Sequence, residues 1–148
     1  MDTDRGRDAR PAEQSPLQDD RRCFACGPEN DQGLQLHFEY GDGTARSHFL
    51  IEPRFAGWTS IVHGGVVATV LDEAMAHAAI AAGVRAVTAR LEIRFRKAAP
   101  INETLLVEGR VEGRRGRLLS LVAKVSGTDD TVYAEAQGRF VADVASGA

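Results

Sequence analysis

One long apolar stretch near the middle of the chain constrains the fold more than any other feature. Residues 66–82 are 17 in number, and the four polar ones are Thr69, Asp72, Glu73 and His77. Most of the others are alanine, leucine or methionine, which favour a helix, and Gly83 is typical of the position just after a helix end. The polar residues form no broad solvated stripe. A helix that is apolar nearly all round must be buried.

Runs with period-two alternation flank this helix and predict strands. Two precede it, at residues 34–40 and 44–51, with the turn Gly41-Asp42-Gly43 between them. Four follow it, at residues 87–95, 105–111, 119–125 and 132–140. Short turns between successive strands favour an antiparallel sheet. One buried helix against one such sheet predicts an α+β fold in which the curved sheet wraps the helix.

Length and composition predict the domain organisation. The 148 residues suit one domain of ordinary size. Residues 1–22 hold six acids, five arginines and only four apolar residues. Such a segment buries too little to offset the entropy of ordering it, so we expect a disordered tail at 1–22 and a single domain at 23–148.

Charge and cysteine content narrow the classes of protein. A net charge of −3 argues against binding nucleic acid through a broad basic surface. No apolar run reaches the roughly 20 residues that span a bilayer, and the first residues lack the apolar core of a secretory signal. Cys23 and Cys26 cannot form a zinc site by themselves. The sequence therefore predicts a cytoplasmic protein with no membrane partner and with reduced, structural cysteines.

Asp72 and Glu73 are unusual residues for a buried helix. Adjacent helix positions lie about 100° apart, so at most one of the two carboxylates easily reaches solvent. A buried carboxylate is costly unless it is neutralised or hydrogen-bonded. An ion pair with Arg90 or Arg94 would satisfy it, and a catalytic role would explain it equally well.

The tripeptide His63-Gly64-Gly65 directly precedes the helix. Glycines let a ligand approach the backbone, and the first-turn N–H groups lie unbonded at the positive end of the helix dipole. These features suit an oxyanion hole for a carbonyl that gains charge in a tetrahedral transition state. The glycines alone would indicate a plain turn. Their combination with a histidine and with Asp72 favours catalysis.

Three segments of the chain resemble hotdog-fold acyl-CoA thioesterases, most closely the PaaI-like branch of the 4-hydroxybenzoyl-CoA thioesterase superfamily. They are residues 63–74, from His63-Gly64-Gly65 to Asp72-Glu73-Ala74, residues 23–34, which include Cys23-Phe24-Ala25-Cys26-Gly27 and Asn30, and residues 88–100. The resemblance spans residues 23–142. It implies the hotdog fold and an enzyme that hydrolyses an aryl- or fatty-acyl thioester to the free acid and coenzyme A.

The resemblance also implies catalytic roles. The Gly65 N–H, with that of Gly64, polarises the thioester carbonyl, and His63 orients the carbonyl or the loop. Asp72 supplies the carboxylate, either as nucleophile or as general base. The adjacent Glu73 is the alternative acid and is otherwise expected to contact substrate.

Thr88 matches a strand residue that holds the attacking water in similar sequences. In a regular strand its side chain would point to the same face as Arg90 and to the face opposite Leu91. A bulge or a dimer interface is therefore needed to bring Thr88 to the site.

Further substrate contacts are expected from a loop aromatic residue, from the N-terminal motif and from a basic strand face. These residues are Trp58, Asn30, Arg90, Arg94 and Arg96, with the arginines facing coenzyme A phosphates. The resemblance implies homodimers with active sites across the interface, often paired into homotetramers, and needs no metal or other cofactor. A solvated or interface strand face is the alternative for each arginine, and ordinary packing is the alternative for Trp58.

Two other functions fit the same fold. One is a non-catalytic acyl-CoA-binding module, against which an intact Asp72 argues. The other is a hotdog hydratase or dehydratase, which usually has a different arrangement of histidine and acid. The acyl group, and the choice between coenzyme A and a carrier protein as its thiol, stay open.

Overall fold

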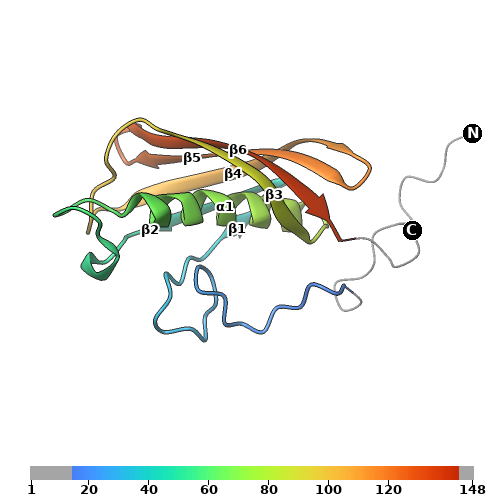
Figure 1. Cartoon of the computed structure of the whole chain (residues 1–148), viewed down its shortest axis with the longest axis horizontal. Helices are drawn as coiled ribbons and strands as arrows, with labels where there is room; N and C mark the ends of the chain where they lie inside the picture. The colour runs from blue at the N-terminus through green and yellow to red at the C-terminus, as the bar shows by residue number, and fades with distance from the viewer. Residues whose placement is uncertain (1–14, 144–148) are drawn as a thin grey trace, which may run out of the picture.

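The computed structural model of this chain describes residues 15–143 and has one long helix packed on one curved sheet (Figure 1). Before the helix come β1 (Glu39–Tyr40), β2 (Thr44–Phe49) and the short 3-10 helix η2 (Pro53–Phe55). The long helix is α1 (Gly64–Ala81), and it is followed by β3 (Ala86–Phe95), β4 (Leu105–Arg115), β5 (Leu118–Gly127) and β6 (Val132–Ala142). The six strands have the spatial order β1-β2-β4-β5-β6-β3, with every neighbouring pair antiparallel. The predicted α+β hotdog fold is confirmed.

Helix α1 is the centre of the hydrophobic core. It begins at Gly64 rather than at the predicted Val66, because the His63 side chain caps its first turn, and it ends before Gly83, which has a φ of +89°. Its buried residues are Val67, Val70, Leu71, Ala74, Met75, Ala78 and Ala79. By length and composition alone α1 could cross a membrane. Here it is the core helix of the fold, packed between the sheet and the N-terminal segment.

The segment before β1 covers the side of α1 that faces away from the sheet (Figure 1). The predicted strand at 34–40 is wrong over most of its length, since only Glu39–Tyr40 pairs in the sheet. Gln35 has a φ of +53°, and the N–H groups of Leu34 and Leu36 donate to Phe24 and Ala25 carbonyls at 2.8 and 2.9 Å. The alternating apolar side chains therefore pack on the helix and the N-terminal loop instead of extending the sheet.

Part of the predicted tail lies outside the described residues, namely 1–14. Residues 15–22 run beside the end of the sheet. The buried Ser15 donates a hydrogen bond to Asp143, and Arg85 Nη1 donates to the Leu17 carbonyl at 2.5 Å. The domain boundary at residue 23 stays a prediction.

A β-bulge in β3 settles which way Thr88 faces. Thr88 pairs with Phe140 and Arg90 with Arg139, so Ala89 is the extra residue, and Leu91 then pairs with Gly138. Phe140 is fully buried and Gly138 contacts the core. The bulge thus puts Thr88 on the helix side of the sheet together with Leu91, while the β3 arginines face outward.

Helix α1 approaches β4 so closely that Gly109 has no room for a side chain. A Cβ atom at Gly109 would lie 2.4 Å from the carbonyl oxygen of Ala74, which is helix backbone and cannot rotate away. We expect Gly109→Ala to lower the free energy of unfolding by about 3 kcal/mol, because helix and sheet must separate. Urea denaturation measures this. Gly113→Ala, in the same strand with nothing within 4 Å of its Cβ, is the control, and equal losses in both variants would contradict the close approach.

Candidate active site

Asp72 projects from α1 toward β3, where Thr88 meets it. Thr88 Oγ1 donates a hydrogen bond to Asp72 Oδ1 at 2.5 Å. The ion pair with Arg90 or Arg94 considered for this acid does not form. Arg90 faces outward and lies 3.9 Å from Glu92. The hydrogen-bond partner of this half-buried carboxylate is thus a neutral hydroxyl.

The surroundings of Asp72 make it a stronger base than an ordinary aspartate. Burial raises the pKa of Asp72, the hydrogen bond from Thr88 acts in the opposite direction, and the nearby negative charge of Glu73 raises it further. The net result is a pKa above the usual value. A carboxylate with a raised pKa binds a proton more readily, which suits a general base.

The Thr88 hydroxyl stabilises the charged form of Asp72, so its removal has a defined effect on the pH dependence of activity. In Thr88→Val we expect the acid limb of the pH–rate profile to move to higher pH by about one unit, since a hydrogen bond to a charged group contributes roughly 1.5 kcal/mol. Measuring kcat/KM against pH tests this. Thr88→Ser, which keeps the hydroxyl, should restore the wild-type limb. If the acid limb of the Thr88→Val profile stays at the wild-type pH, the Thr88 hydroxyl does not act on the acid that titrates.

At the start of α1 the two predicted backbone donors, the Gly64 and Gly65 N–H groups, have different surroundings. The Gly65 N–H donates to His63 Nδ1 at 2.9 Å, so the helix cap uses it. Gly64 occupies the first helical position, and within residues 15–143 its N–H has no hydrogen-bond partner. Because His63 Nδ1 accepts this hydrogen bond from Gly65, the ring carries its hydrogen on Nε2. At the start of α1 the Gly64 N–H and His63 Nε2–H are therefore open to a substrate oxygen, and oxyanion binding by the Gly65 N–H stays a prediction.

An open hollow of about 640 Å³ lies beside these donors. Trp58, His63, Gly64 and Arg96, all predicted to be site residues, line it together with Phe95. The Trp58 side chain is 83% exposed at its rim. Sequence segments about 40 residues apart thus meet at the start of the helix, as a binding site for an extended substrate requires.

Asp72 does not line this hollow. It lies seven residues beyond Gly65, which places the two about 10 Å apart along the helix axis. That separation is too long for a carboxylate and an oxyanion donor to act on one carbonyl carbon. The predicted site residues therefore form two separate groups on each chain, one at the start of α1 and one at its centre.

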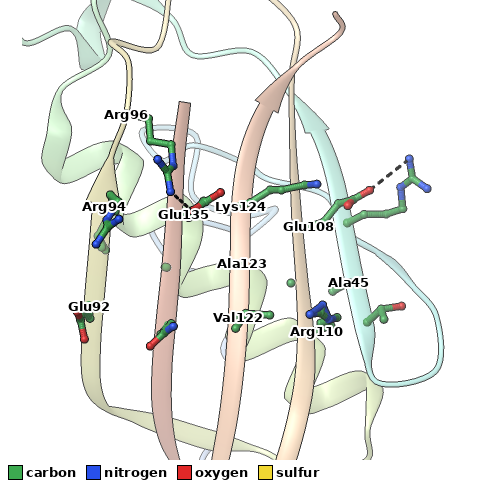
Figure 2. Close-up of a pocket in the computed structure, with 16 residues that line it drawn as sticks. Ala45, Glu92, Arg94, Arg96, Glu108, Arg110, Val122, Ala123, Lys124 and Glu135 are labelled. Carbon is green, nitrogen blue, oxygen red and sulfur yellow. Dashed lines mark hydrogen bonds and ion pairs between the residues drawn. The ribbon is translucent and has the colours of Figure 1, made fainter. Parts of the chain in front are cut away.

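Two of the predicted arginines, Arg94 and Arg96, lie among acidic side chains on the outward face of the sheet (Figure 2). The strand register puts Arg94, Glu135, Lys124, Glu108 and Arg46 in one row across five strands. This row borders a second open hollow of about 870 Å³.

Arg96 borders the same hollow and forms a 2.9 Å ion pair with Glu135, whereas Arg90 lies farther along β3. The structure does not bring Arg90, Arg94 and Arg96 together as one purely basic patch. Alternating cross-strand charges stabilise this face, and phosphate binding by the arginines stays a prediction.

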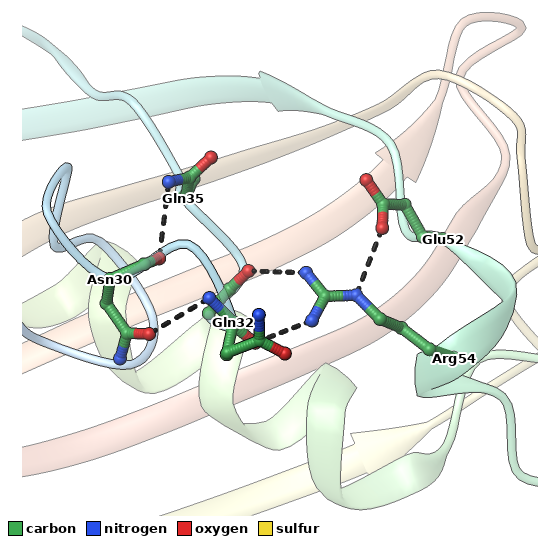
Figure 3. Close-up of polar contacts among 6 residues, drawn as sticks. Asn30, Gln32, Gln35, Glu52 and Arg54 are labelled. Carbon is green, nitrogen blue, oxygen red and sulfur yellow. Dashed lines mark hydrogen bonds and ion pairs between the residues drawn. The ribbon is translucent and has the colours of Figure 1, made fainter.

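Asn30 organises the N-terminal loop (Figure 3). Its Nδ2 donates to the Arg22 carbonyl at 3.2 Å, and its Oδ1 accepts from the Gln32 N–H at 3.1 Å. Arg54 holds this loop from the other side, donating to the carbonyls of Gln32 and Gly33 at 2.8 and 3.2 Å. Both polar atoms of the Asn30 side chain are engaged in shaping the loop, and its contact with substrate stays a prediction.

Glu73 has different surroundings from Asp72. Its carboxylate lies 3.3 Å from His77 Nε2 and accepts from Cys23 Sγ at 3.6 Å. Burial acts to raise the pKa of Glu73, but hydrogen bonds from His77, Cys26 and Cys23 and the charge of His77 outweigh it and leave the pKa lowered. These contacts leave Asp72 as the better candidate for the catalytic acid.

The group of side chains around Glu73 was not predicted from the sequence. Tyr40 Oη lies 2.7 Å from His77 Nδ1, and the His77 ring stacks on Phe38 with centroids 4.2 Å apart. The i,i+4 spacing of Glu73 and His77 was the available signal. Burial and the negative charge of Glu73 raise the pKa of the Cys26 thiol, which makes it a poor nucleophile at neutral pH.

A single central helix wrapped by a curved antiparallel sheet, with a histidine-glycine-glycine start and an acid at its centre, defines a hotdog-fold protein. The family model described as Thioesterase superfamily matches residues 59–136. This chain belongs to the thioesterase superfamily.

Relatives and solved structures agree with this membership. Acyl-coenzyme A thioesterase THEM4 of Bos taurus is 31% identical over 81% of this chain and 51% of its own length, and that of Mus musculus is 34% identical over 57% and 37%. A solved thioesterase superfamily protein has a TM-score of 0.78 at 29% identity, covering 82% of this chain and 63% of that one.

The PaaI protein of E. coli, from the phenylacetic acid degradation operon, has a TM-score of 0.69 at 18% identity over 74% of this chain and 80% of that one, and so shares the fold. The present chain spans about half the length, or less, of the curated relatives it matches.

Proposed function

We propose that this chain is an acyl-CoA thioesterase, which hydrolyses an acyl thioester to a carboxylic acid and free coenzyme A. The observation that carries the proposal is the hydrogen-bonded, half-buried Asp72, a base of raised pKa on the same helix that offers Gly64 N–H at its start. Membership of the thioesterase superfamily and the similarity to THEM4 support the choice of reaction and of acyl-CoA as substrate.

In the proposed reaction the two groups of site residues act as two half-sites. One is Gly64 with His63 at the start of α1, and the other is Asp72 at the centre of the helix. Gly64 N–H and His63 Nε2–H stabilise the oxyanion as water or the Asp72 carboxylate attacks the thioester carbon. When water attacks, Asp72 takes a proton from it, the carbon–sulfur bond breaks, and coenzyme A leaves as its thiol with that proton. When Asp72 attacks, the carbon–sulfur bond breaks to leave an acyl anhydride. A water molecule then hydrolyses the anhydride to the carboxylic acid, which restores the Asp72 carboxylate and supplies the proton that the thiolate takes up. The acyl chain lies along the exposed Trp58 and Phe95 in the hollow. In either role Asp72 must be ionised.

The two half-sites are completed by a second copy of the chain. Strand β3 ends the sheet, and on its outer edge no other described strand pairs with it. Two β3 strands meeting antiparallel across a two-fold axis would continue the sheet and set Glu92 near Arg90 or Arg94 of the other copy. The Asp72 of one protomer would then face the Gly64 and His63 of its partner. Pairing of dimers into tetramers is part of the same proposal and rests on the family resemblance.

A direct assay tests the proposed activity. The purified chain is incubated with aryl-acyl, medium-chain and long-chain acyl-CoAs, and the released thiol is followed with a chromogenic disulfide. We expect catalysed release from at least one class, and the ratio of kcat/KM values between classes identifies the acyl group. Binding of acyl-CoA without thiol release would favour the non-catalytic module, and hydration of an enoyl-CoA would favour the hydratase.

A further inference from the structure

The Cys-x-x-Cys motif of the N-terminal loop meets the centre of α1. The sulfur atoms of Cys23 and Cys26 and a carboxylate oxygen of Glu73 all lie within 4.8 Å of one another. Cys23 Sγ and Glu73 Oε1 are 3.6 Å apart, and both cysteines are free thiols. All three side chains are half-buried, so an ion could enter from solvent. The fold thus brings Glu73 of α1 next to the two cysteines of the loop as a third possible ligand.

The loop backbone is arranged around the Cys23 sulfur. The N–H groups of Ala25 and Cys26 point at Sγ with N···S distances of 3.4 and 3.5 Å, and the Gly27 N–H donates to the Cys23 carbonyl at 2.8 Å. A Cβ at Gly27 would lie 2.4 Å from the Cys23 nitrogen, so the tight turn needs a glycine there. These contacts hold the Cys23 sulfur in one position, as a metal ligand requires.

Residues behind Glu73 hold its carboxylate in place. His77 Nε2 lies 3.3 Å from Oε2, while Oε1 is the oxygen nearest Cys23. The His77 ring is fixed in turn by Tyr40 at Nδ1 and by stacking on Phe38. One carboxylate oxygen is therefore oriented by a fixed ring and the other faces the two sulfurs, as in metal sites whose ligands are positioned by outer partners.

We propose that Cys23, Cys26 and Glu73 bind a zinc ion. Two thiolates and one carboxylate form a donor set that suits Zn²⁺, and three protein ligands with one further position open are a known zinc arrangement. Ligand sulfurs of a tetrahedral zinc lie about 3.8 Å apart, so the present spacing closes with small side-chain rotations. Binding releases the two thiol protons to solvent, and a water molecule takes the fourth position.

The ion joins the N-terminal loop to α1 at the residue next to Asp72. Asp72 itself faces Thr88 on β3, and the zinc ligands lie on the side of the helix covered by residues 23–38. The metal therefore has a structural role that holds the loop on the helix, separate from thioester chemistry.

Metal content and X-ray absorption on the full, unaltered chain test this inference without any assay of activity. The protein is purified under reducing conditions, supplied with zinc and dialysed. We expect one zinc per chain, with two sulfur neighbours at about 2.3 Å and the others, oxygen or nitrogen, at about 2.0–2.1 Å. The proposal would be overturned if no zinc is bound, or if the number of sulfur neighbours differs from two.

Three variants and a matched control locate the ligands. His77→Gln removes the outer partner of Glu73 and should lower zinc affinity by about 10- to 100-fold. Cys26→Ser and Glu73→Gln each remove a ligand and should lower zinc affinity at least as much. Glu92→Gln, on the outward face of β3, should bind zinc as the wild type does. Circular dichroism identifies a variant that has not folded. For such a variant, the X-ray absorption spectrum of the unaltered chain decides whether two sulfur atoms bind the zinc. Full zinc affinity in folded Cys26→Ser and Glu73→Gln would overturn the assignment.

Discussion

Replacement of Asp72 by asparagine should lower turnover of an acyl-CoA by about a hundredfold or more while the fold persists. Asparagine keeps the shape of the side chain and can still bond the Thr88 hydroxyl, which lies 2.5 Å from Oδ1. It cannot accept a proton from water or attack a thioester. Steady-state thiol release measures kcat, and the unfolding midpoint shows that stability is kept.

The neighbouring acid is the internal control for this experiment. Glu73→Gln disturbs the contacts with His77 and Cys23 but leaves the Asp72–Thr88 pair unchanged. We expect it to retain far more activity than Asp72→Asn. A folded Asp72→Asn chain with normal turnover, together with an inactive Glu73→Gln chain, would transfer the catalytic role to Glu73.

Removal of the Gly64 N–H should have an effect of similar size. Gly64 is the first residue of α1, where proline fits a helix, and His63 has φ −55° and ψ 133°, a conformation that suits the residue before a proline. A Cβ there meets only the Phe95 ring, at 3.9 Å. Gly64→Pro therefore deletes one donor with little strain, and loss of an oxyanion donor lowers kcat by about 10²–10³-fold.

Gly64→Ala is the matched control, since it adds a Cβ and keeps the N–H. It should stay within a few-fold of wild type, with kcat measured on the same acyl-CoA. Equal losses in the alanine and proline variants would mean that crowding of the hollow, rather than the missing donor, reduces the rate.

The two inactive variants together test the shared site. If Asp72 and Gly64 act across a dimer, a mixed dimer of Asp72→Asn and Gly64→Pro chains holds one intact site. Statistical reassociation makes half of the dimers mixed, so about a quarter of wild-type activity should return. Absence of recovery, with mixed dimers demonstrated by mass spectrometry, would place both groups in one chain.

Local sequence patterns determined most of the architecture. The apolar stretch at 66–82 identified the buried helix, because a helix that is apolar on nearly every side has to be removed from water. Period-two alternation located the strands after it. These features depend on interactions between residues close in sequence, which a pattern can record. The predicted helix start at Val66 lies two residues from the observed start at Gly64, and the cap by His63 became evident only in the structure.

Tertiary structure decided which partner each functional side chain has. The sequence suggested an ion pair between Asp72 and an arginine of β3. The bulge at Ala89 instead points Thr88 toward the helix and leaves Arg90 on the outward face of the sheet. A period-two run near residue 36 looked like a strand, yet it covers α1, because a helix that is apolar all round must be covered on the side that the sheet does not reach.

The site around Glu73 has the same origin. Cys23 and Glu73 are 50 residues apart in sequence and 3.6 Å apart in space. Spacing along the chain cannot encode that proximity, because it arises when the N-terminal loop packs across the helix. The sequence by itself determined the elements and the chemical groups they carry, and the packing of those elements decided which groups meet.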